Sequence, residues 1–291
     1  MDGSEPFDGS AQLEGRAAVV TGAGSGFGAA IAHELARAGM AVAALDIDPG
    51  RAEETAASVR GLGVAAIAVP FDAGDAASIR DAARHVDERL GSCSLLCANV
   101  GVQQFGSLDR LTDDDWTWVI GVNVLGTVRT VTAFLPLLRR ASGWRHVAIT
   151  ASVGVFTPAV RLGAYTASKA ALVGYGETLR LELAPEGIGV TLVFPSGMMT
   201  RHLESSAAAR PETLGPSVTL PDDIEAMMAG APSMHADEVV EAADAVRGLV
   251  PQLVADEPYV FTHGRLRAGY EARHREILRA IERMERARGL A

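Results

Sequence analysis

The sequence contains little cysteine and lacks a long run of apolar residues. Its only two cysteines, Cys93 and Cys97, are too few for a disulfide framework and fit a reducing, cytoplasmic environment. No apolar run is expected to reach the ~18 residues that a membrane span needs. The acidic, polar start from Met1 to Ser10 is unlike a signal peptide. We therefore expect a cytoplasmic protein with no membrane-embedded segment.

Positive charge is also scarce. Lysine and arginine number 26 against 36 acidic residues, so the formal net charge is −10. This balance argues against binding to nucleic acid or to an anionic membrane surface. Lys169 is the only lysine in the chain. The seven histidines include no pair at metal-ligand spacing, and we expect no metal site.

Apolar residues make up 48% of the 291 residues, enough for a large core, which excludes a disordered chain. Short apolar segments alternate with amphipathic helical patterns, as in a parallel sheet covered on both faces. The segments lie at 17–20, 41–45, 64–69, 94–98, 147–150, 190–194 and 259–262. We predict an α/β protein with a Rossmann-type, doubly wound parallel sheet of about seven strands in a three-layer α/β/α arrangement.

The pattern is expected to form one domain over residues 15–264, after a flexible tail over 1–14. Residues 198–235 have no clear period, which is typical of a substrate lid in this architecture. A charged, arginine-rich helical extension is predicted over 265–291, either as a solvated cap or as a contact between subunits.

A glycine-rich segment, Thr21-Gly22-Ala23-Gly24-Ser25-Gly26-Phe27-Gly28, follows the first predicted strand and opens the first predicted helix. Glycines let the backbone turn sharply and approach a pyrophosphate closely. The start of the helix adds free N–H groups and a partial positive charge. The segment therefore predicts a nucleotide-binding site.

An acidic residue, Asp46, ends the second predicted strand. A carboxylate at this place accepts hydrogen bonds from ribose hydroxyls and repels a 2′-phosphate, so NAD is favoured over NADP. Arg51, close in sequence, is expected on the exposed face of the second helix. Asp72, which ends the third predicted strand, has two interpretations: a bond to the adenine amino group, or a turn with Gly74.

Tyr165 and Lys169 stand four residues apart, on the same face of a predicted helix. With four tyrosines and one lysine in the chain, a chance pair at this spacing has a probability of about 1%. An ammonium about 6 Å from a phenol, at an effective dielectric constant of about 20, lowers the phenol pKa by about two units. Tyr165 is then a candidate general acid or base.

Two polar residues complete the candidate catalytic set. Ser152 follows the fifth predicted strand, where a hydroxyl can bond the reacting oxygen of a substrate. Asn123 lies in an otherwise apolar helix and needs polar partners if it is buried.

With these motifs in place, the chain resembles the short-chain dehydrogenase/reductase family over roughly residues 14–263. The resemblance implies that Tyr165 transfers the proton, Ser152 orients the substrate, Lys169 holds the nicotinamide ribose, and Asn123 helps to bind a relay water. It also implies a homodimer or homotetramer. The expected cofactor-binding residues are Gly22, Ser25, Gly26, Phe27, Gly28, Asp46, Asp72, Asn99, Gly101, Tyr165, Lys169, Pro195 and Thr200.

Two departures from the family pattern stand out. The family's Asn-Asn-Ala-Gly appears here as Ala98-Asn99-Val100-Gly101, so the bonds of its first asparagine must come from elsewhere. The family's Pro-Gly is Pro195-Ser196 in this chain.

The predicted lid is rich in adaptable methionine and leucine side chains, which suggests a bulky, largely apolar secondary alcohol or ketone as substrate. These side chains belong to Met198, Met199, Leu203, Met227, Met228 and Met234. Packing within the lid is the alternative interpretation. His202 is interpreted either as a substrate contact or as a surface histidine.

The leading hypothesis is an NAD-dependent alcohol dehydrogenase. The alternatives are an NADPH-dependent carbonyl reductase and a non-catalytic NAD-binding regulatory protein.

Overall fold

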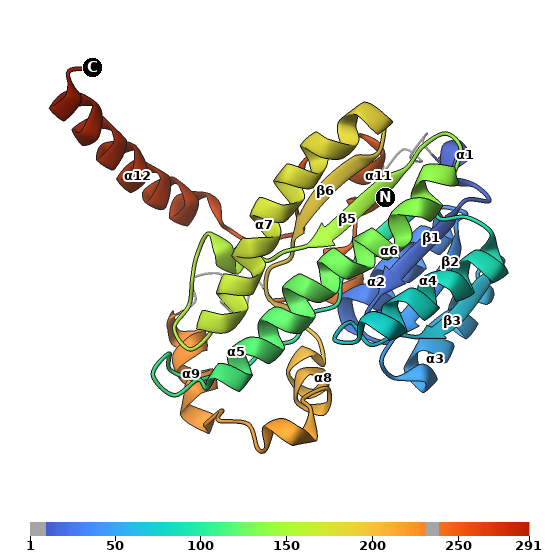
Figure 1. Cartoon of the computed structure of the whole chain (residues 1–291), viewed down its shortest axis with the longest axis horizontal. Coiled ribbons are helices and arrows are strands. Elements are labelled where there is room, and N and C mark those ends of the chain that lie inside the picture. Colours follow the sequence, from blue (N-terminus) through green and yellow to red (C-terminus); the bar gives the residue numbers. More distant parts are fainter. Residues whose placement is uncertain (1–9, 231–238, 291) are drawn as a thin grey trace, which may run out of the picture.

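The computed structural model describes residues 10–230 and 239–290. At its centre is a parallel sheet of seven strands in the order β3-β2-β1-β4-β5-β6-β9 (Figure 1). The strands are β1 (Ala17–Thr21), β2 (Ala41–Asp46), β3 (Ala66–Pro70), β4 (Leu95–Ala98), β5 (His146–Thr150), β6 (Gly189–Phe194) and β9 (Tyr259–Phe261). Every segment predicted to be a strand forms one, with ends that differ by one or two residues. The predicted Rossmann-type fold is confirmed.

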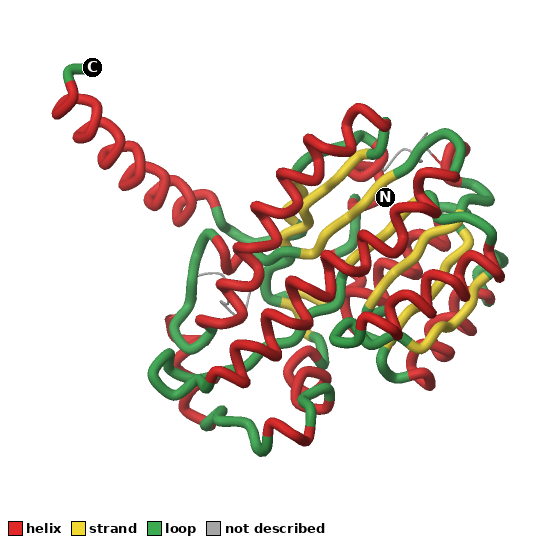
Figure 2. Tube along the Cα trace, in the orientation of Figure 1, coloured by secondary structure: helices red, strands yellow, loops and turns green. Residues whose placement is uncertain are grey.

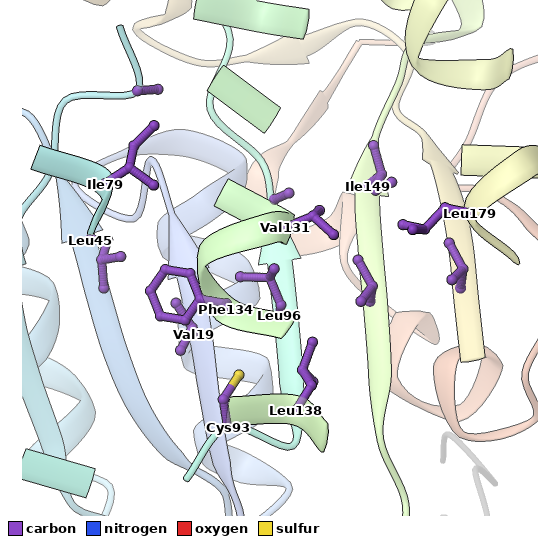
Figure 3. Close-up of a cluster of buried hydrophobic side chains, with 14 of the residues drawn as sticks. Val19, Leu45, Ile79, Cys93, Leu96, Val131, Phe134, Leu138, Ile149 and Leu179 are labelled. Carbon is purple, nitrogen blue, oxygen red and sulfur yellow. The ribbon is translucent and has the colours of Figure 1, made fainter. Parts of the chain in front are cut away.

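Helices cover both faces of the sheet (Figure 2), because successive side chains of a strand point to opposite sides. Val19 belongs to the core cluster on one face, and its neighbours Ala18 and Val20 belong to the cluster on the other. Figure 3 shows Phe134 over Val19 and Leu96 in the first cluster. This face packs against α4 (Ala76–Leu90), α6 (Thr127–Arg140) and α7 (Gly163–Leu183). The opposite face packs against α2 (Gly26–Arg37), α3 (Pro49–Arg60) and α11 (Leu249–Val254).

One long helix corrects the expectation that no apolar stretch of the chain reaches the length of a membrane span. Together α5 (Asp113–Ile120), the π-helical turn η1 (Gly121–Gly126) and α6 form a continuous helix, Asp113–Arg140. This helix is long and apolar enough to cross a membrane, by length and composition only. Of its most apolar stretch of 18 residues, 44% is buried in the structure. Isolated polar residues interrupt this stretch, so it does not stand out in the sequence as a long apolar run. Core helices of globular proteins share it, and here Val131, Phe134 and Leu138 are buried against the sheet.

Two further segments differ from the prediction. The tail expected to be flexible over 1–14 contains α1 (Ser10–Leu13), with Leu13 fully buried, while residues 1–9 lie outside the described part. The predicted lid, which lacks a clear period, contains short helices. In order, its described elements are β7 (Met198–Met199), α8 (His202–Ala208), η4 (Glu212–Leu214) and α9 (Pro221–Gly230). After them come β8 (Val240–Glu241), which pairs with β7, and α10 (Ala242–Ala245).

Two buried carboxylates hold the lid segment to the rest of the protein. Asp115, fully buried, accepts from Arg210 at 2.7 Å. Burial alone would raise the pKa of Asp115, but hydrogen bonds from Thr112 and the Arg210 guanidinium lower it. Asp223 accepts from Arg110 at 2.7 Å and is 2% exposed. Moving α8 or α9 away would separate these pairs and leave a buried charge without compensation, which costs free energy. The two contacts therefore hold α8 and α9 in position.

His146 is a buried group that cannot easily take up a proton. It begins β5, is stacked on Trp144, and its Nε2 lies 2.8 Å from the Thr191 hydroxyl. That hydroxyl donates to the carbonyl of Glu257 at 2.6 Å, so Nε2 must carry the hydrogen and Nδ1 is a bare acceptor. Nδ1 has no hydrogen-bond partner among the described residues and lies 3.8 Å from the Asp256 carboxylate. Burial lowers the pKa of His146 to about 4.

This histidine predicts a loss of stability in acid. An unfolded histidine has a pKa of about 6.5, so between pH 6.5 and 4 the unfolded chain binds a proton that buried His146 does not. The free energy of unfolding should therefore fall by up to about 3 kcal/mol over this range. In His146→Asn, urea unfolding from pH 7 to 4.5 should show a shallower pH dependence. An unchanged slope contradicts the assignment.

Candidate active site

The predicted site residues meet at the carboxyl ends of the strands. After β3 the chain returns across the sheet to place β4 beside β1, and such a reversal leaves a crevice at the strand ends. A cleft of about 1210 Å³ lies there. It is lined by Gly22, Ser25, Gly26, Phe27, Gly28, Asp46, Asp72, Asn99, Gly101, Ser152, Tyr165, Lys169, Pro195 and Thr200. Of the predicted site residues, Asn123 alone is absent from this lining.

The glycine-rich segment connects β1 to α2 as predicted. Gly22 and Gly26 have φ values of +66° and +53°, which favour glycine. A Cβ on Gly28 would lie 2.0 Å from the carbonyl oxygen of Gly22, and a Cβ on Gly26 would lie 3.2 Å from Thr200. The backbone is thus open toward the cleft where α2 presents its first N–H groups, and this arrangement fits a pyrophosphate.

Asp46 is held firmly beside this segment. Its Oδ2 accepts from the backbone N–H of Gly24 at 2.8 Å, and its Oδ1 accepts from Asp48 at 3.0 Å. Each carboxylate oxygen has two acceptor positions, so the group keeps capacity for two ribose hydroxyls.

Arg51 does not take its expected place on an exposed helix face. It lines the cleft, and a Cβ on Gly24 would lie 2.8 Å from Arg51 and 2.7 Å from Asp46. Its Nε lies 3.3 Å from Asp48, and its Nη1 reaches Ser205 of α8 at 3.5 Å. The first turn of α3 points along the cleft, and sequence distance alone could not show this. The Arg51 charge therefore belongs to the cleft that Asp46 also lines, where it is paired with Asp48.

Asp72 forms the turn that was one of its two interpretations. Its Oδ1 accepts from the N–H of Gly74 at 2.7 Å. The residue also lines the cleft, so the turn and a contact with a ligand are compatible.

At the position where the family's first asparagine is Ala98, the neighbouring strand ends are joined through Asn99 and two threonines. The Thr21 hydroxyl accepts from the N–H of Asn99 at 2.9 Å, and the Asn99 side chain donates to the Thr21 carbonyl at 3.1 Å. The Thr150 hydroxyl donates to Asn99 at 3.0 Å. Ends of β1, β4 and β5 are thereby joined although Ala98 replaces a polar residue.

Tyr165 and Lys169 lie one turn apart on α7, facing Ser152 just after β5. The Lys169 Nζ is 5.7 Å from the centre of the Tyr165 ring and donates to the carbonyl of Thr150 at 2.8 Å. Ser152 hydrogen-bonds to Tyr165 and also accepts from the N–H of Gly154 at 3.1 Å. A phenol, a hydroxyl and an ammonium are thus brought to one place.

The expected direction of the tyrosine pKa is wrong for the protein without cofactor. Burial raises the pKa of Tyr165, and the hydrogen bond from Ser152 opposes this only in part. Burial also lowers the pKa of Lys169, which is 3% exposed, to about 8. The attraction between ammonium and phenolate is outweighed here by desolvation, which disfavours both charged groups in this cleft.

Asn123 is buried behind the cleft with all its side-chain groups paired. Its Oδ1 accepts from the N–H of Val102 at 2.8 Å, and its Nδ2 donates to the Val102 carbonyl at 2.9 Å and to Ser168 at 2.8 Å. The need for polar partners is confirmed. Asn123 ties the loop after β4 to the π-helical turn and to α7, the helix of Tyr165.

His202 is the residue that the sequence did not resolve. Its ring meets the Tyr165 ring edge-on, with 6.2 Å between their centres, and the residue lines the cleft. Burial, and secondly the charge of Lys169, lower the pKa of His202 to about 4, so the imidazole is neutral at pH 7. The sequence signal that could have placed His202 in the cleft is its position two residues after Thr200, an expected cofactor-binding residue.

The comparisons with known proteins agree with this arrangement. The family model for short chain dehydrogenases matches residues 16–211. The chain is 28% identical to a C alpha-dehydrogenase of Sphingobium over 94% of its length and 88% of that protein. It is 30% identical to the 2,3-dihydro-2,3-dihydroxybenzoate dehydrogenase of Bacillus subtilis, over 82% of this chain and 90% of the relative.

Among solved structures, a short-chain dehydrogenase/reductase from Burkholderia phymatum in complex with NAD has a TM-score of 0.83 and 31% identity, covering 91% of this chain and 95% of that one. NAD⁺-bound xylitol dehydrogenase has a TM-score of 0.73 and 25% identity, covering 87% and 100%. With the motif residues lining one cleft, the matched relatives identify this chain as a member of the short-chain dehydrogenase/reductase family and an NAD(P)-dependent oxidoreductase.

Proposed function

We propose that the protein interconverts a secondary alcohol and a ketone by hydride transfer, with NAD as cofactor and Tyr165 as general acid and base. The observation that carries the proposal is the meeting of Tyr165, Ser152 and Lys169 in the cleft that the glycine-rich segment also lines. When bound, the nicotinamide supplies a carbon that accepts or releases the hydride.

The chain's own residues manage the proton. In alcohol oxidation the Tyr165 oxygen accepts the hydroxyl proton, and in ketone reduction it returns the proton to the carbonyl oxygen. The Ser152 hydroxyl lies beside Tyr165 and is placed to turn its single hydrogen from the phenol to the substrate oxygen. Asn123 fixes α7, and by family resemblance it also helps to hold a relay water.

Lys169 has two tasks in this proposal. One of its three ammonium hydrogens is used by Thr150, and two remain for the hydroxyls of the nicotinamide ribose. A ligand that fills the cleft with hydrogen-bond acceptors restores part of the solvation that burial removes from the ammonium. The charged ammonium then favours the phenolate, so the pKa of Tyr165 falls once such a ligand is bound.

An apolar substrate is supported by the walls of the cleft. Of the lid residues expected to line it, Met198, Leu203 and Met227 do so, whereas Met199 and Met228 are 61% and 51% exposed. Met234 lies outside the described residues. The sequence did not reveal the apolar contribution from outside the lid, which comes from Phe105, Trp118, Leu125 and Leu162. We propose that the lid covers a bulky, largely apolar substrate, with neutral His202 beside its reacting oxygen.

An NADPH-dependent carbonyl reductase is a second candidate because Arg51 stands beside Asp46. We favour NAD, since the carboxylate is the group held in place by two backbone donors. We keep a cytoplasmic location as part of the proposal; both cysteines are buried, and burial raises the pKa of Cys97 to about 12, so its thiol is unreactive.

The role of Tyr165 is tested by Tyr165→Phe. We expect kcat/KM on the best secondary alcohol of a panel to fall by roughly 10²- to 10⁴-fold, since the proton acceptor is lost, while the Kd for NAD, from fluorescence quenching, rises by no more than about tenfold, the effect of losing one hydrogen bond. Tyr175→Phe is the matched control, because this tyrosine lies on the same helix but has no lysine four residues on. Full turnover by Tyr165→Phe contradicts the mechanism.

Cofactor choice is tested by the ratio of kcat/KM for NADP to that for NAD. In Asp46→Asn we expect this ratio to rise about tenfold or more, because the repulsion of a 2′-phosphate by a nearby charge is removed. Adding Arg51→Gln to this variant should reverse most of the gain. If the native protein already prefers NADP, the second candidate function replaces the first.

The apolar substrate is tested with a series of secondary alcohols of increasing chain length. Each buried methylene contributes about 0.8 kcal/mol, so kcat/KM should rise about fourfold per methylene until the cleft is filled. Met227→Ser should flatten this rise. Met228→Ser, one residue further on the same helix but exposed, should not. Turnover of small polyols alone speaks against the idea.

A further inference from the structure

The C-terminal helix α12 (Arg267–Arg288) is an arm that leaves the rest of the protein (Figure 1). None of its 22 residues is buried. At its base the Tyr270 ring meets Phe156 at 5.5 Å between ring centres, and Arg273 donates to the carbonyl of Val155. Beyond this base the helix projects away from the domain (Figure 2). In proteins most of the stability of a helix comes from the packing of an apolar face rather than from helix propensity.

One side of α12 carries a regular stripe, which we define as Tyr270, His274, Ile277, Ile281 and Met284. The intervals between them alternate between four and three residues. This is the spacing that places side chains along one seam of a helix for packing against another protein surface. Ile277 is 48% exposed, Ile281 42% and Met284 45%, although these are side chains that burial favours.

The charge of the arm indicates what this stripe contacts. The helix holds seven arginines and four glutamates, a formal charge of +3, whereas the whole chain carries −10. The residues outside the helix therefore carry −13. A basic arm is attracted to the acidic body of another copy and repelled by another arm. An anionic membrane also attracts a basic amphipathic helix, but the acidic body that comes with this helix opposes that approach.

We propose that α12 docks through its stripe on the body of a second copy of this chain. A two-fold axis makes the contact reciprocal, so each copy gives one arm and receives one. The contact buries the apolar stripe and brings the net positive charge of the helix close to an acidic body.

Sedimentation velocity on the full chain tests the proposal. The native protein should assemble beyond the monomer, and Ile277→Gln/Ile281→Gln should raise the Kd of assembly by at least about tenfold, since two apolar side chains are lost from the contact. The matched control, Ala272→Gln/Arg279→Lys, alters the opposite face at constant charge and should assemble like the native chain. Circular dichroism should show that both variants keep their fold.

Three outcomes overturn the proposal: a monomeric native chain, a stripe variant that assembles as tightly as the native chain, or a control variant that dissociates equally. Co-sedimentation with vesicles of phosphatidylcholine and phosphatidylserine tests the membrane as the other occupant. Binding to these vesicles that the stripe variant loses, in a native chain that stays monomeric in solution, assigns the arm to a membrane surface instead.

Discussion

The site depends on one buried ammonium. Lys169 is 3% exposed and donates to a main-chain carbonyl, and within the described residues it takes part in no ion pair. Its pKa is lowered to about 8 by burial, so at neutral pH the charge is retained at a cost in desolvation. A carboxylate nearby would remove that cost, but it would also neutralise the field that acts on Tyr165. The pKa of Lys169 is therefore sensitive to any ligand that enters the cleft.

The sheet provides the rigidity that such a charge needs. The carbonyl that accepts from Lys169 belongs to Thr150 at the end of β5, and the hydroxyl of the same residue donates to Asn99 after β4. Asn99 is in turn bonded to Thr21, the last residue of β1 and the first of the glycine-rich segment. A short chain of hydrogen bonds thus connects Lys169 with the start of the glycine-rich segment. Because each link stands at a strand end, the packing of the core fixes the distance between the two halves of the site.

Much of this was predictable from the sequence because it depends on local rules. Continuous apolar segments identified the seven strands of the central sheet. Spacing placed Tyr165 and Lys169 on one helix face. Asn123 could be recognised as a polar residue in an apolar helix.

What escaped prediction depends on tertiary placement. Leu13 is buried because the chain before β1 folds back against the core, although its sequence looks like a tail. The direction of the Tyr165 pKa required a knowledge of burial that spacing cannot give. The positions of Arg51 and His202 depend on how the turn after β2 and the segment after β6 approach each other across the cleft, and no local pattern encodes such an approach.

Arg51 and His202 are connected by α8: His202 is its first residue, and Arg51 contacts its residue Ser205. At its first residue the His202 ring touches Tyr165, and Ser205 lies 3.5 Å from Arg51 beside Asp46. The next residue, Ser206, accepts from the backbone of Gln103 at 3.1 Å. One short helix therefore contacts Tyr165, Arg51 and the loop after β4. Because these contacts come from one short helix, the surroundings of Tyr165 and of Arg51 depend on the same placement of α8.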